Sequence, residues 1–216
     1  MIEMKCCDIL GTRILVTNMA DTVERIEHDM EELRGKYICV GNVHPTGMAH
    51  DDAHYHEVQK SAAFVLPDGK PLSVYSRKHG FPEAERVTGP DLMLELFARE
   101  NGLKHYFYGG SPETLQMLEQ KLRERYPHLQ IAGMVSPPFR SLSEKEDAAE
   151  VEKINASGAD IIWVGLGAPK QENWMYDHRD KVHGVMIGVG AGFDYHAGNI
   201  KRAPMWMQKL SLEWLY

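Results

Sequence analysis

The stretch "ADIIWVGLGAPKQENW" (159–174) places a short apolar run directly before a turn rich in glycine and proline. The run "ADIIWVG" is typical of a strand that is buried on both faces, because apolar and polar residues do not alternate in it. Lysine, glutamine and glutamate then occur where a helix would begin. This order predicts a strand–turn–helix unit with polar groups at the carboxyl end of a buried strand.

The same alternation of apolar runs and helix-like segments extends through most of the chain. It predicts a mainly parallel, doubly wound, Rossmann-like α/β sheet with helices on both faces. We expect one domain over residues 1–216. The expected strands cover residues 36–43, 62–67, 104–110, 129–136, 159–167 and 184–192. The expected helices cover residues 21–35, 89–102, 111–127 and 141–158.

The composition excludes several classes of protein. The formal net charge of −7 argues against a broad nucleic-acid-binding face. No apolar run approaches the roughly 20 residues that span a bilayer. Cys6, Cys7 and Cys39 lack a metal-type spacing, and the start "MIEMKCCDIL" (1–10) does not have the pattern of a secretory leader. We therefore expect a cytoplasmic protein.

Three predicted strands end in glycine-containing turns, "FYGGSPE" (107–113), "VGLGAPKQE" (164–172) and "IGVGAGFDY" (187–195). In a parallel sheet these turns share one edge, where open α/β folds bind ligands, and helix N-termini there favour anions. The pattern indicates a site for an unidentified anionic ligand, although ordinary strand-to-helix turns also use Gly and Pro. The nicotinamide-dinucleotide fingerprint is broken and the P-loop pattern is absent, which disfavours a nicotinamide-dependent oxidoreductase.

Other polar residues are predicted at the same edge. Asp68, in "VLPDGKPL" (65–72), is either a general base or half of an ordinary Asp-Gly turn. Asn42 ends the preceding strand, and Arg86 is either a clamp for a diphosphate or a surface residue. The cluster "HDDAHYH" (50–56) suggests metal ligands, but a solvated helix face is the better interpretation, and we predict no metal site.

In chain order, the motifs "GNV", "PDGKPL", "ERVTGPDL", "FYGGSPE", "GLGAPKQE", "GAGFDYHAG", "RAP" and "LEW" resemble those of the WecG/TagA/CpsF family of glycosyltransferases. The resemblance covers nearly the whole chain, and the combination of "GLGAPKQE" with "GAGFDYHAG" is highly specific. It implies inverting transfer of N-acetylmannosamine or a related sugar from a UDP-sugar. The implied acceptor is N-acetylglucosamine linked to undecaprenyl diphosphate, in the synthesis of teichoic acid or another cell-surface polysaccharide.

The resemblance also implies roles for individual residues. Asp68 would be the base, with Asn42, Arg86 and Gln171 as its polar partners, and no metal would be required. The UDP-sugar would lie along the glycine-ended strands. The residues expected to bind it are Gly109, Gly110, Gly165, Gly167, Lys170, Glu172 and Asp194.

Two departures from the family pattern keep a second function open. Val40 stands where the family usually has Thr, two residues before Asn42. Members usually continue past "LEWLY" (212–216) with a basic tail, so we expect this chain to lack a C-terminal membrane-contacting tail. The alternative function is a UDP-sugar-binding regulatory module without turnover. For the enzyme, we expect a peripheral position on the inner face of the cell membrane, and self-association stays open.

The end of the sequence, "MWMQKLSLEWLY" (205–216), is apolar at many helical positions. We expect a helix there that presents Trp206, Leu210, Trp214 and Leu215 to a further segment or partner.

Overall fold

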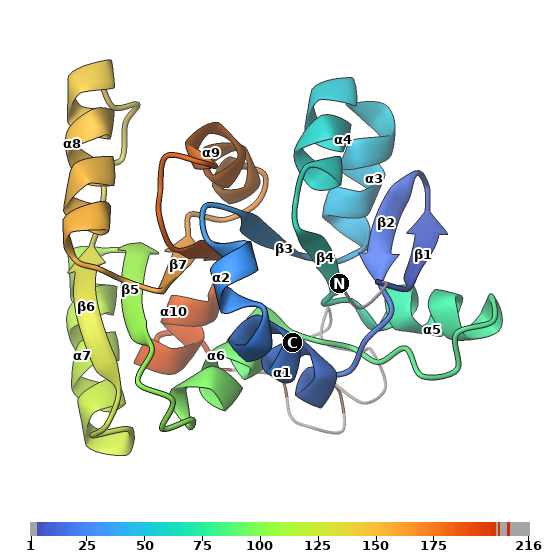
Figure 1. Ribbon diagram of the computed structural model, residues 1–216, viewed down its shortest axis with the longest axis horizontal. Helices are drawn as coiled ribbons and strands as arrows, with labels where there is room; N and C mark the ends of the chain where they lie inside the picture. The colour runs from blue at the N-terminus through green and yellow to red at the C-terminus, as the bar shows by residue number, and fades with distance from the viewer. Residues whose placement is uncertain (1–3, 202, 204–206, 208–216) are drawn as a thin grey trace.

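A computed structural model describes residues 4–201, 203 and 207 of the chain. Its centre is an eight-stranded sheet in the order β1-β2-β4-β3-β8-β7-β5-β6 (Figure 1). The strands are β1 (Cys6–Ile9), β2 (Thr12–Leu15), β3 (Tyr37–Gly41), β4 (Phe64–Pro67), β5 (Lys104–Gly109), β6 (Gln130–Val135), β7 (Ile161–Gly165) and β8 (Val185–Gly188). All six predicted strands are confirmed, and they pair in parallel, as predicted.

The first two strands were not predicted. β1 and β2 form an antiparallel hairpin at the edge of the sheet, and β2 pairs with β4 in parallel. Both strands have only four residues. Unlike β4 and β8, which are equally short, they carry charged residues, in "CCDI" and "TRIL", so the sequence pattern did not reveal them as apolar runs.

Helices cover both faces of the sheet, which confirms the predicted α/β architecture (Figure 1). They are α1 (Met19–His28), α2 (Met30–Leu33), α3 (Val43–Asp51), α4 (Ala53–Lys60), α5 (Lys70–Lys78), α6 (Gly89–Phe97), α7 (Pro112–Arg125), α8 (Glu144–Ala156), α9 (Lys170–His178) and α10 (Gly192–Ala197). Helices α1, α6, α7 and α10 lie on one face, and α3, α4, α8 and α9 lie on the other.

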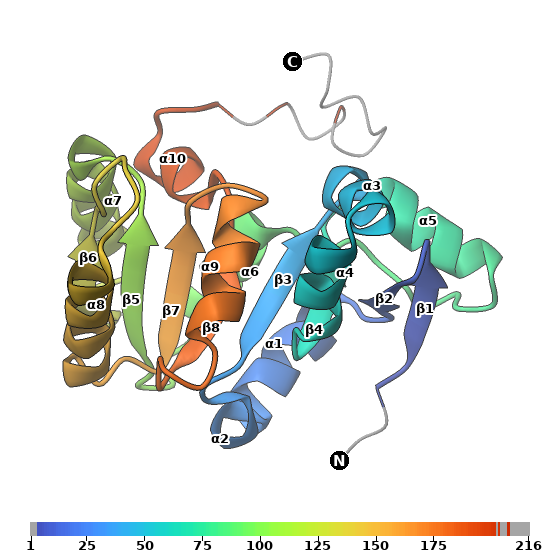
Figure 2. The ribbon, with the colours of Figure 1, turned by 90° about the horizontal axis from the view of Figure 1, so that it is seen from above.

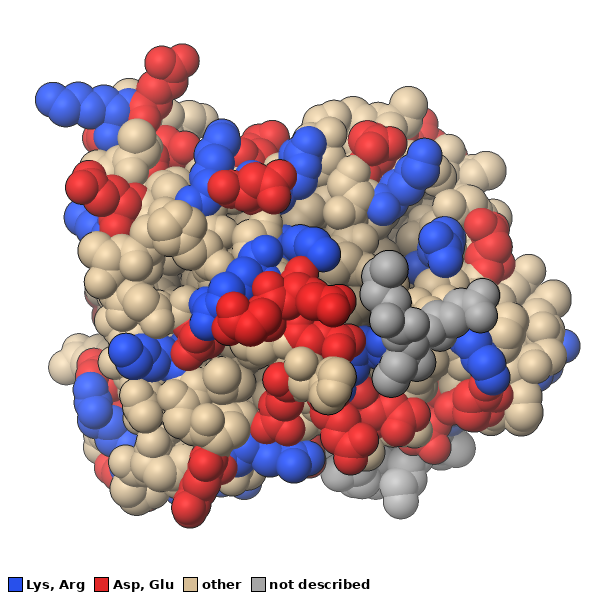
Figure 3. Space-filling model, viewed as in Figure 1, with Lys and Arg blue, Asp and Glu red and all other residues tan. Residues whose placement is uncertain are grey.

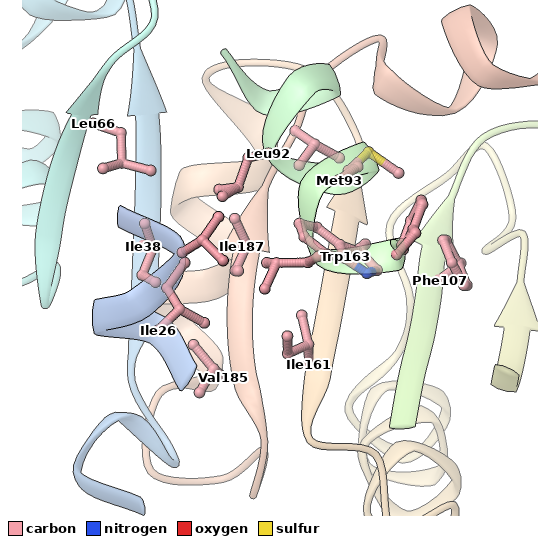
Figure 4. Close-up of a cluster of buried hydrophobic side chains, with 14 of the residues drawn as sticks. Ile26, Ile38, Leu66, Leu92, Met93, Phe107, Ile161, Trp163, Val185 and Ile187 are labelled. Atoms are coloured by element: carbon pink, nitrogen blue, oxygen red, sulfur yellow. The ribbon is translucent and has the colours of Figure 1, made fainter. Parts of the chain in front are cut away.

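The larger core lies between the sheet and the first of these helix layers. Trp163 and Ile187 from neighbouring strands meet Leu92 and Met93 of α6 there, as Figure 4 shows. All four side chains are fully buried. Burying a large apolar side chain contributes about 1.5–3 kcal/mol, so this layer fixes α6 and α10 against the sheet.

Two helix starts show standard capping chemistry. The Ser111 hydroxyl accepts from the Thr114 N–H at the start of α7, and Ser143 and Glu146 form a complete capping box at the start of α8. The prediction of a single helix over residues 21–35 is wrong, because Asp29 separates two helices there, α1 and α2. The "MWMQKLSLEWLY" segment (205–216) lies outside the described residues except for Met207.

The parallel strands place their carboxyl ends at one edge of the sheet. Figure 2 shows the arrowheads of β3, β5 and β7 pointing the same way, towards the level of α3 and α10. None of the helices in the described residues is long and apolar enough to cross a membrane. On the face drawn in Figure 3, acidic and basic side chains are interspersed, in line with the absence of a broad basic surface expected from the net charge.

Candidate active site

A cavity of about 800 Å³ opens where β3, β4 and β8 end. Small-molecule sites usually enclose about 300–1,000 Å³, so a ligand the size of a nucleotide sugar fits this volume. The lining side chains come from the strand ends and from the segment after α10. They are Val40, Asn42, His44, Pro45, Asp68, Arg86, Thr88, Pro90, Ala168, Gln171, Val189, Gly190, Ala191, Tyr195, Asn199, Ile200, Lys201 and Ala203.

The order of the strands explains why a cavity forms here. β3 and β8 are neighbours in the sheet. The chain leaves β3 towards α3 and α4 on one face, whereas it leaves β8 towards α10 on the other. A crevice opens where neighbouring parallel strands send their connections to opposite faces, and such switch points are preferred ligand sites.

Asp68 and Arg86 form an ion pair on the wall of the cavity. Asp68 follows β4 directly, and its N–H donates to the Gly41 carbonyl at 2.9 Å, which ties the ends of β4 and β3 together. Arg86 donates from Nε to the Asp68 carbonyl, and its Nη2 lies 3.6 Å from Asp68 Oδ1. The two side chains are 27% and 24% exposed. A carboxylate is therefore oriented by a cation and stays accessible to a ligand.

Asn42 follows β3 and caps α3. Its Oδ1 accepts from the His44 N–H at 2.9 Å, which is the standard N-cap contact. The Asn42 amide NH₂ has no hydrogen-bond partner among the described residues. A side chain added at Gly69 would come within 3.2 Å of the Asn42 Cβ, so the Asp68–Gly69 turn packs directly on Asn42. The two predicted site residues are thus held together, with donor N–H groups directed away from the helix cap.

Gln171, in the first turn of α9, also lines the cavity, but its amide is already hydrogen-bonded within the protein. Its Oε1 accepts from the Gly190 N–H at 3.0 Å, and its Nε2 donates to Glu172 Oε1 at 2.8 Å. Gly188 leaves room for it, since a Cβ there would lie 3.0 Å from Gln171 Nε2. The side chain is 3% exposed. The Gln171 amide has one remaining N–H to offer a ligand.

Glu172 lies behind the cavity and does not line it. It is 2% exposed, and burial raises the pKa of its carboxyl, opposed by hydrogen bonds from Gln171 and from the Tyr55 hydroxyl. Its Oε2 atom has no partner within hydrogen-bonding distance among the described residues. The predicted contact between Glu172 and the donor sugar stays untested, but the fold directs this carboxylate into the interior.

The glycine turns after β5 and β7 have a packing role. A Cβ on Gly109 would lie 2.3 Å from the Gly165 carbonyl oxygen, and Gly109 has a φ of +126°. A Cβ on Gly165 would lie 2.8 Å from the ring of Phe193 in α10. Phe193 also approaches the position that a Gly110 Cβ would take, at 3.4 Å. Packing accounts for Gly109 and Gly165 without a ligand, and Gly110 has a φ of +69°, which favours glycine. The role of all three in donor binding stays a prediction.

The remaining predicted donor residues lie at the same edge but outside the residues that line the cavity. Asp194 Oδ1 accepts from Thr114 Oγ1 at 3.1 Å and from Asn199 Nδ2 at 3.0 Å, so it joins α10 to α7 and to the segment that follows α10. Lys170 lies over the Phe139 ring, 5.7 Å from its centroid. Gly167 has open space around its Cα.

Several cavity residues were not singled out from the sequence. Lys201 adds a second cationic side chain to the lining, in addition to Arg86. Tyr195 and Asn199 come from α10 and the segment after it, and Thr88 caps α6 by accepting from the Asp91 N–H. The sequence could have indicated Thr88, because "TGPD" has the pattern of a helix start. No sequence pattern indicated Lys201.

The "HDDAHYH" cluster (50–56) is divided between α3 and α4. Asp52 lies between α3 and α4 and caps α4 by accepting from the Tyr55 N–H. Over the described part of the chain, no group of three or more His, Cys, Asp or Glu side chains is arranged to hold a metal ion. The predicted solvated face of one helix is therefore wrong in two respects: the cluster spans two helices, and Tyr55 within it is buried. The absence of a bound metal stays a prediction.

Residues 7–216 match the Glycosyl transferase WecG/TagA/CpsF family. A protein of Bacillus subtilis (strain 168) is 32% identical over 204 residues, which cover 93% of this chain and 77% of that protein. One of Staphylococcus aureus (strain NCTC 8325 / PS 47) is 31% identical over 214 residues, covering 97% and 82%. Both are named N-acetylglucosaminyldiphosphoundecaprenol N-acetyl-beta-D-mannosaminyltransferase. The chain therefore belongs to the WecG/TagA/CpsF family and is a glycosyltransferase.

Proposed function

We propose that this chain transfers N-acetylmannosamine or a related sugar from a UDP-sugar to N-acetylglucosamine on undecaprenyl diphosphate, with inversion at the anomeric carbon. The product would serve the synthesis of teichoic acid or another cell-surface polysaccharide. The names of the two relatives support the acceptor and the sugar. The observation that carries the proposal is the Asp68 carboxylate, held by Arg86 on the wall of a cavity of nucleotide-sugar size.

Asp68 would act as the general base in a single displacement. The acceptor hydroxyl oxygen forms a bond to the anomeric carbon as the bond between that carbon and the diphosphate oxygen breaks. The proton passes to the Asp68 carboxylate, and the electron pair leaves with UDP. Arg86 keeps the carboxylate turned towards the cavity, and the Asn42 amide NH₂ is placed to bind a sugar hydroxyl.

The leaving diphosphate requires positive charge or N–H donors. Arg86 and Lys201 are two cationic side chains among the described lining residues, and the Gly190 turn adds backbone to the same wall. Preorganised donors at the site of developing charge commonly provide the largest share of catalysis. We therefore propose that transfer does not depend on a bound metal ion, which an assay with and without EDTA checks.

The experiment is an assay of UDP release against a panel of UDP-sugars, with a short-chain polyprenyl diphosphate N-acetylglucosamine as acceptor. We expect release only when both substrates are present, fastest with UDP-N-acetylmannosamine, and a product of inverted anomeric configuration by NMR. UDP-sugar binding without acceptor-dependent release would contradict the proposal and would favour the regulatory module. A product of retained configuration would remove Asp68 as the sole base.

A lipid-linked acceptor also requires the enzyme to meet a membrane surface. We propose peripheral contact with the inner face of the cell membrane. Sedimentation with vesicles, with and without anionic lipid, tests this contact, and equal recovery of the protein in the supernatant under both conditions would contradict it.

A further inference from the structure

Buried polar side chains of α4 and α9 lie together beside the wall of the cavity. Gln59 donates to the Tyr55 hydroxyl at 3.1 Å, and Tyr55 is a neighbour of Glu172. Glu172 accepts from Gln171, and Gln171 accepts from the Gly190 N–H. All four side chains are at most 5% exposed. A buried polar group is costly when it loses its partner, so the Glu172–Gln171 bond and the Gln171–Gly190 bond constrain each other.

Chemistry fixes the direction of the central link. A carboxylate only accepts hydrogen bonds, whereas a primary amide donates at one end and accepts at the other. Gln171 must therefore turn its NH₂ towards Glu172 and its carbonyl towards the Gly190 N–H, as observed. With a neutral amide in place of Glu172, residue 172 could bond to either the NH₂ or the carbonyl of Gln171. The bond to residue 172 would then no longer select one orientation of the Gln171 amide.

The Gly190 turn depends on this orientation. Gly190 has a φ of +54° and borders the cavity with open space beside its Cα. Its N–H bond to Gln171 joins the turn after β8 to α9, and both residues line the cavity. If Gln171 turned its NH₂ to this N–H, two donors would face each other and the turn would shift.

We propose that Glu172 is a positioning residue: it orients the Gln171 amide and, through it, holds the Gly190 backbone in place as a wall of the cavity. The consequence for catalysis rests on the proposed function, whereas the structural link does not. A misplacement of about 1 Å near reacting groups can reduce turnover about 100-fold. Glu172 thus acts on the reaction without touching either substrate.

The test compares Glu172→Gln with Tyr55→Phe by hydrogen exchange of individual backbone amides and by kinetics. Tyr55→Phe is the matched control, because it removes a neighbour of Glu172 but leaves the Glu172–Gln171 bond. We expect Glu172→Gln to speed exchange of the Gly190 amide about tenfold or more relative to the Ile187 amide in β8, and to lower kcat/KM about 10- to 100-fold. We expect Tyr55→Phe to leave Gly190 exchange within about twofold, since the Gln171 orientation persists.

Unchanged Gly190 exchange in folded Glu172→Gln would overturn the proposal. If that variant does not fold, NMR of the unaltered protein decides instead: a scalar coupling across the hydrogen bond between Gly190 N and the Gln171 side-chain carbonyl is expected, and its absence refutes the link. Faster Gly190 exchange in a protein that shows no transfer would leave the positioning role standing and remove only the proposed function.

Discussion

Two crevices lie at the same edge of the sheet, and over the described residues the turns close one of them and leave a cavity at the other. β3 and β8 send their connections to opposite faces, and so do β5 and β7. Between β3 and β8 the turns carry Asn42 and Gly190, and a cavity results. Between β5 and β7, Gly109 lies against Gly165, and the Phe193 ring covers Gly165.

The difference teaches that a glycine-rich turn at the ligand edge does not by itself indicate a ligand. Glycine permits close approach of backbone to any neighbour, which here is another strand and an aromatic ring. The open crevice is instead marked by polar residues that follow strands. Each prediction below either separates the two crevices or tests what the open one does.

The largest effect is expected in the open crevice, from Asp68→Asn. Removing a positioned base typically costs about 10²–10⁴-fold in rate, while the shape of the cavity is kept. We expect transfer to fall by that factor with UDP affinity nearly unchanged, measured by UDP release and by calorimetric titration. Asp177→Asn, an exposed change on α9, is the control. Turnover like that of the unaltered enzyme in folded Asp68→Asn would remove Asp68 from the mechanism.

In the closed crevice, we expect a substitution to lower the free energy of unfolding. In Gly109→Ala, the new Cβ would meet the Gly165 carbonyl oxygen at 2.3 Å in a backbone conformation that disfavours L side chains. We expect the free energy of unfolding to fall by about 2–6 kcal/mol, from overpacking together with backbone strain. Gly190→Ala is the matched change in the open crevice, where a Cβ meets nothing within 4 Å. Only the left-handed backbone then costs stability, about 1–2 kcal/mol.

Urea denaturation measures both glycine variants. Equal loss of stability in Gly109→Ala and Gly190→Ala would show that the β5–β7 crevice is no more tightly closed than the β3–β8 crevice.

A smaller effect is expected from pH, through Glu172. Burial raises the pKa of this carboxyl above its ordinary value of 4.5, and the groups facing it are Tyr55 on α4, Cys39 on β3 and the neighbouring Gln171. Since the folded state binds this proton more tightly than the unfolded state, its contribution to stability is full below pH 4.5 and is lost as pH rises through the folded pKa.

Glu172→Gln lacks this titration. We therefore expect the stability of the variant, relative to the unaltered protein, to increase as pH rises above 4.5, at no more than about 1.4 kcal/mol per pH unit. Unfolding curves across the range test this. A constant difference would mean that Glu172 titrates normally and is not desolvated.

The smallest change concerns Val40, which lines the open crevice and for which the family resemblance implies Thr. Val40→Thr adds one hydroxyl near the cavity. A single neutral hydrogen bond contributes about 0.5–1.5 kcal/mol, so we expect kcat/KM to rise by no more than about tenfold. A larger gain, from a very low starting rate, would favour the non-catalytic module as the function of the chain as it stands.

Strands β3, β4, β5, β7 and β8 could be predicted because they are buried on both faces and are largely apolar. The edge strand β6 is only partly buried, and its short apolar run was enough to indicate it. The ligand edge followed from the direction of these strands, and so did the placement of Asn42 and Asp68. Which crevice is open could not be predicted, because it depends on where the Phe193 ring packs across three elements. The inward position of Glu172 could not be predicted either: consecutive helical residues point about 100° apart, so it is buried behind the cavity while Gln171 lines it.

The location of bound UDP tests the central claim most directly. A crystal structure of the protein with UDP is predicted to show the nucleotide diphosphate in the β3–β8 crevice, in contact with Arg86 or Lys201 and with the Gly190 turn. The Phe193 ring is predicted to keep its place on Gly165. A diphosphate bound over Gly109 and Gly165, with Phe193 displaced, would contradict the account.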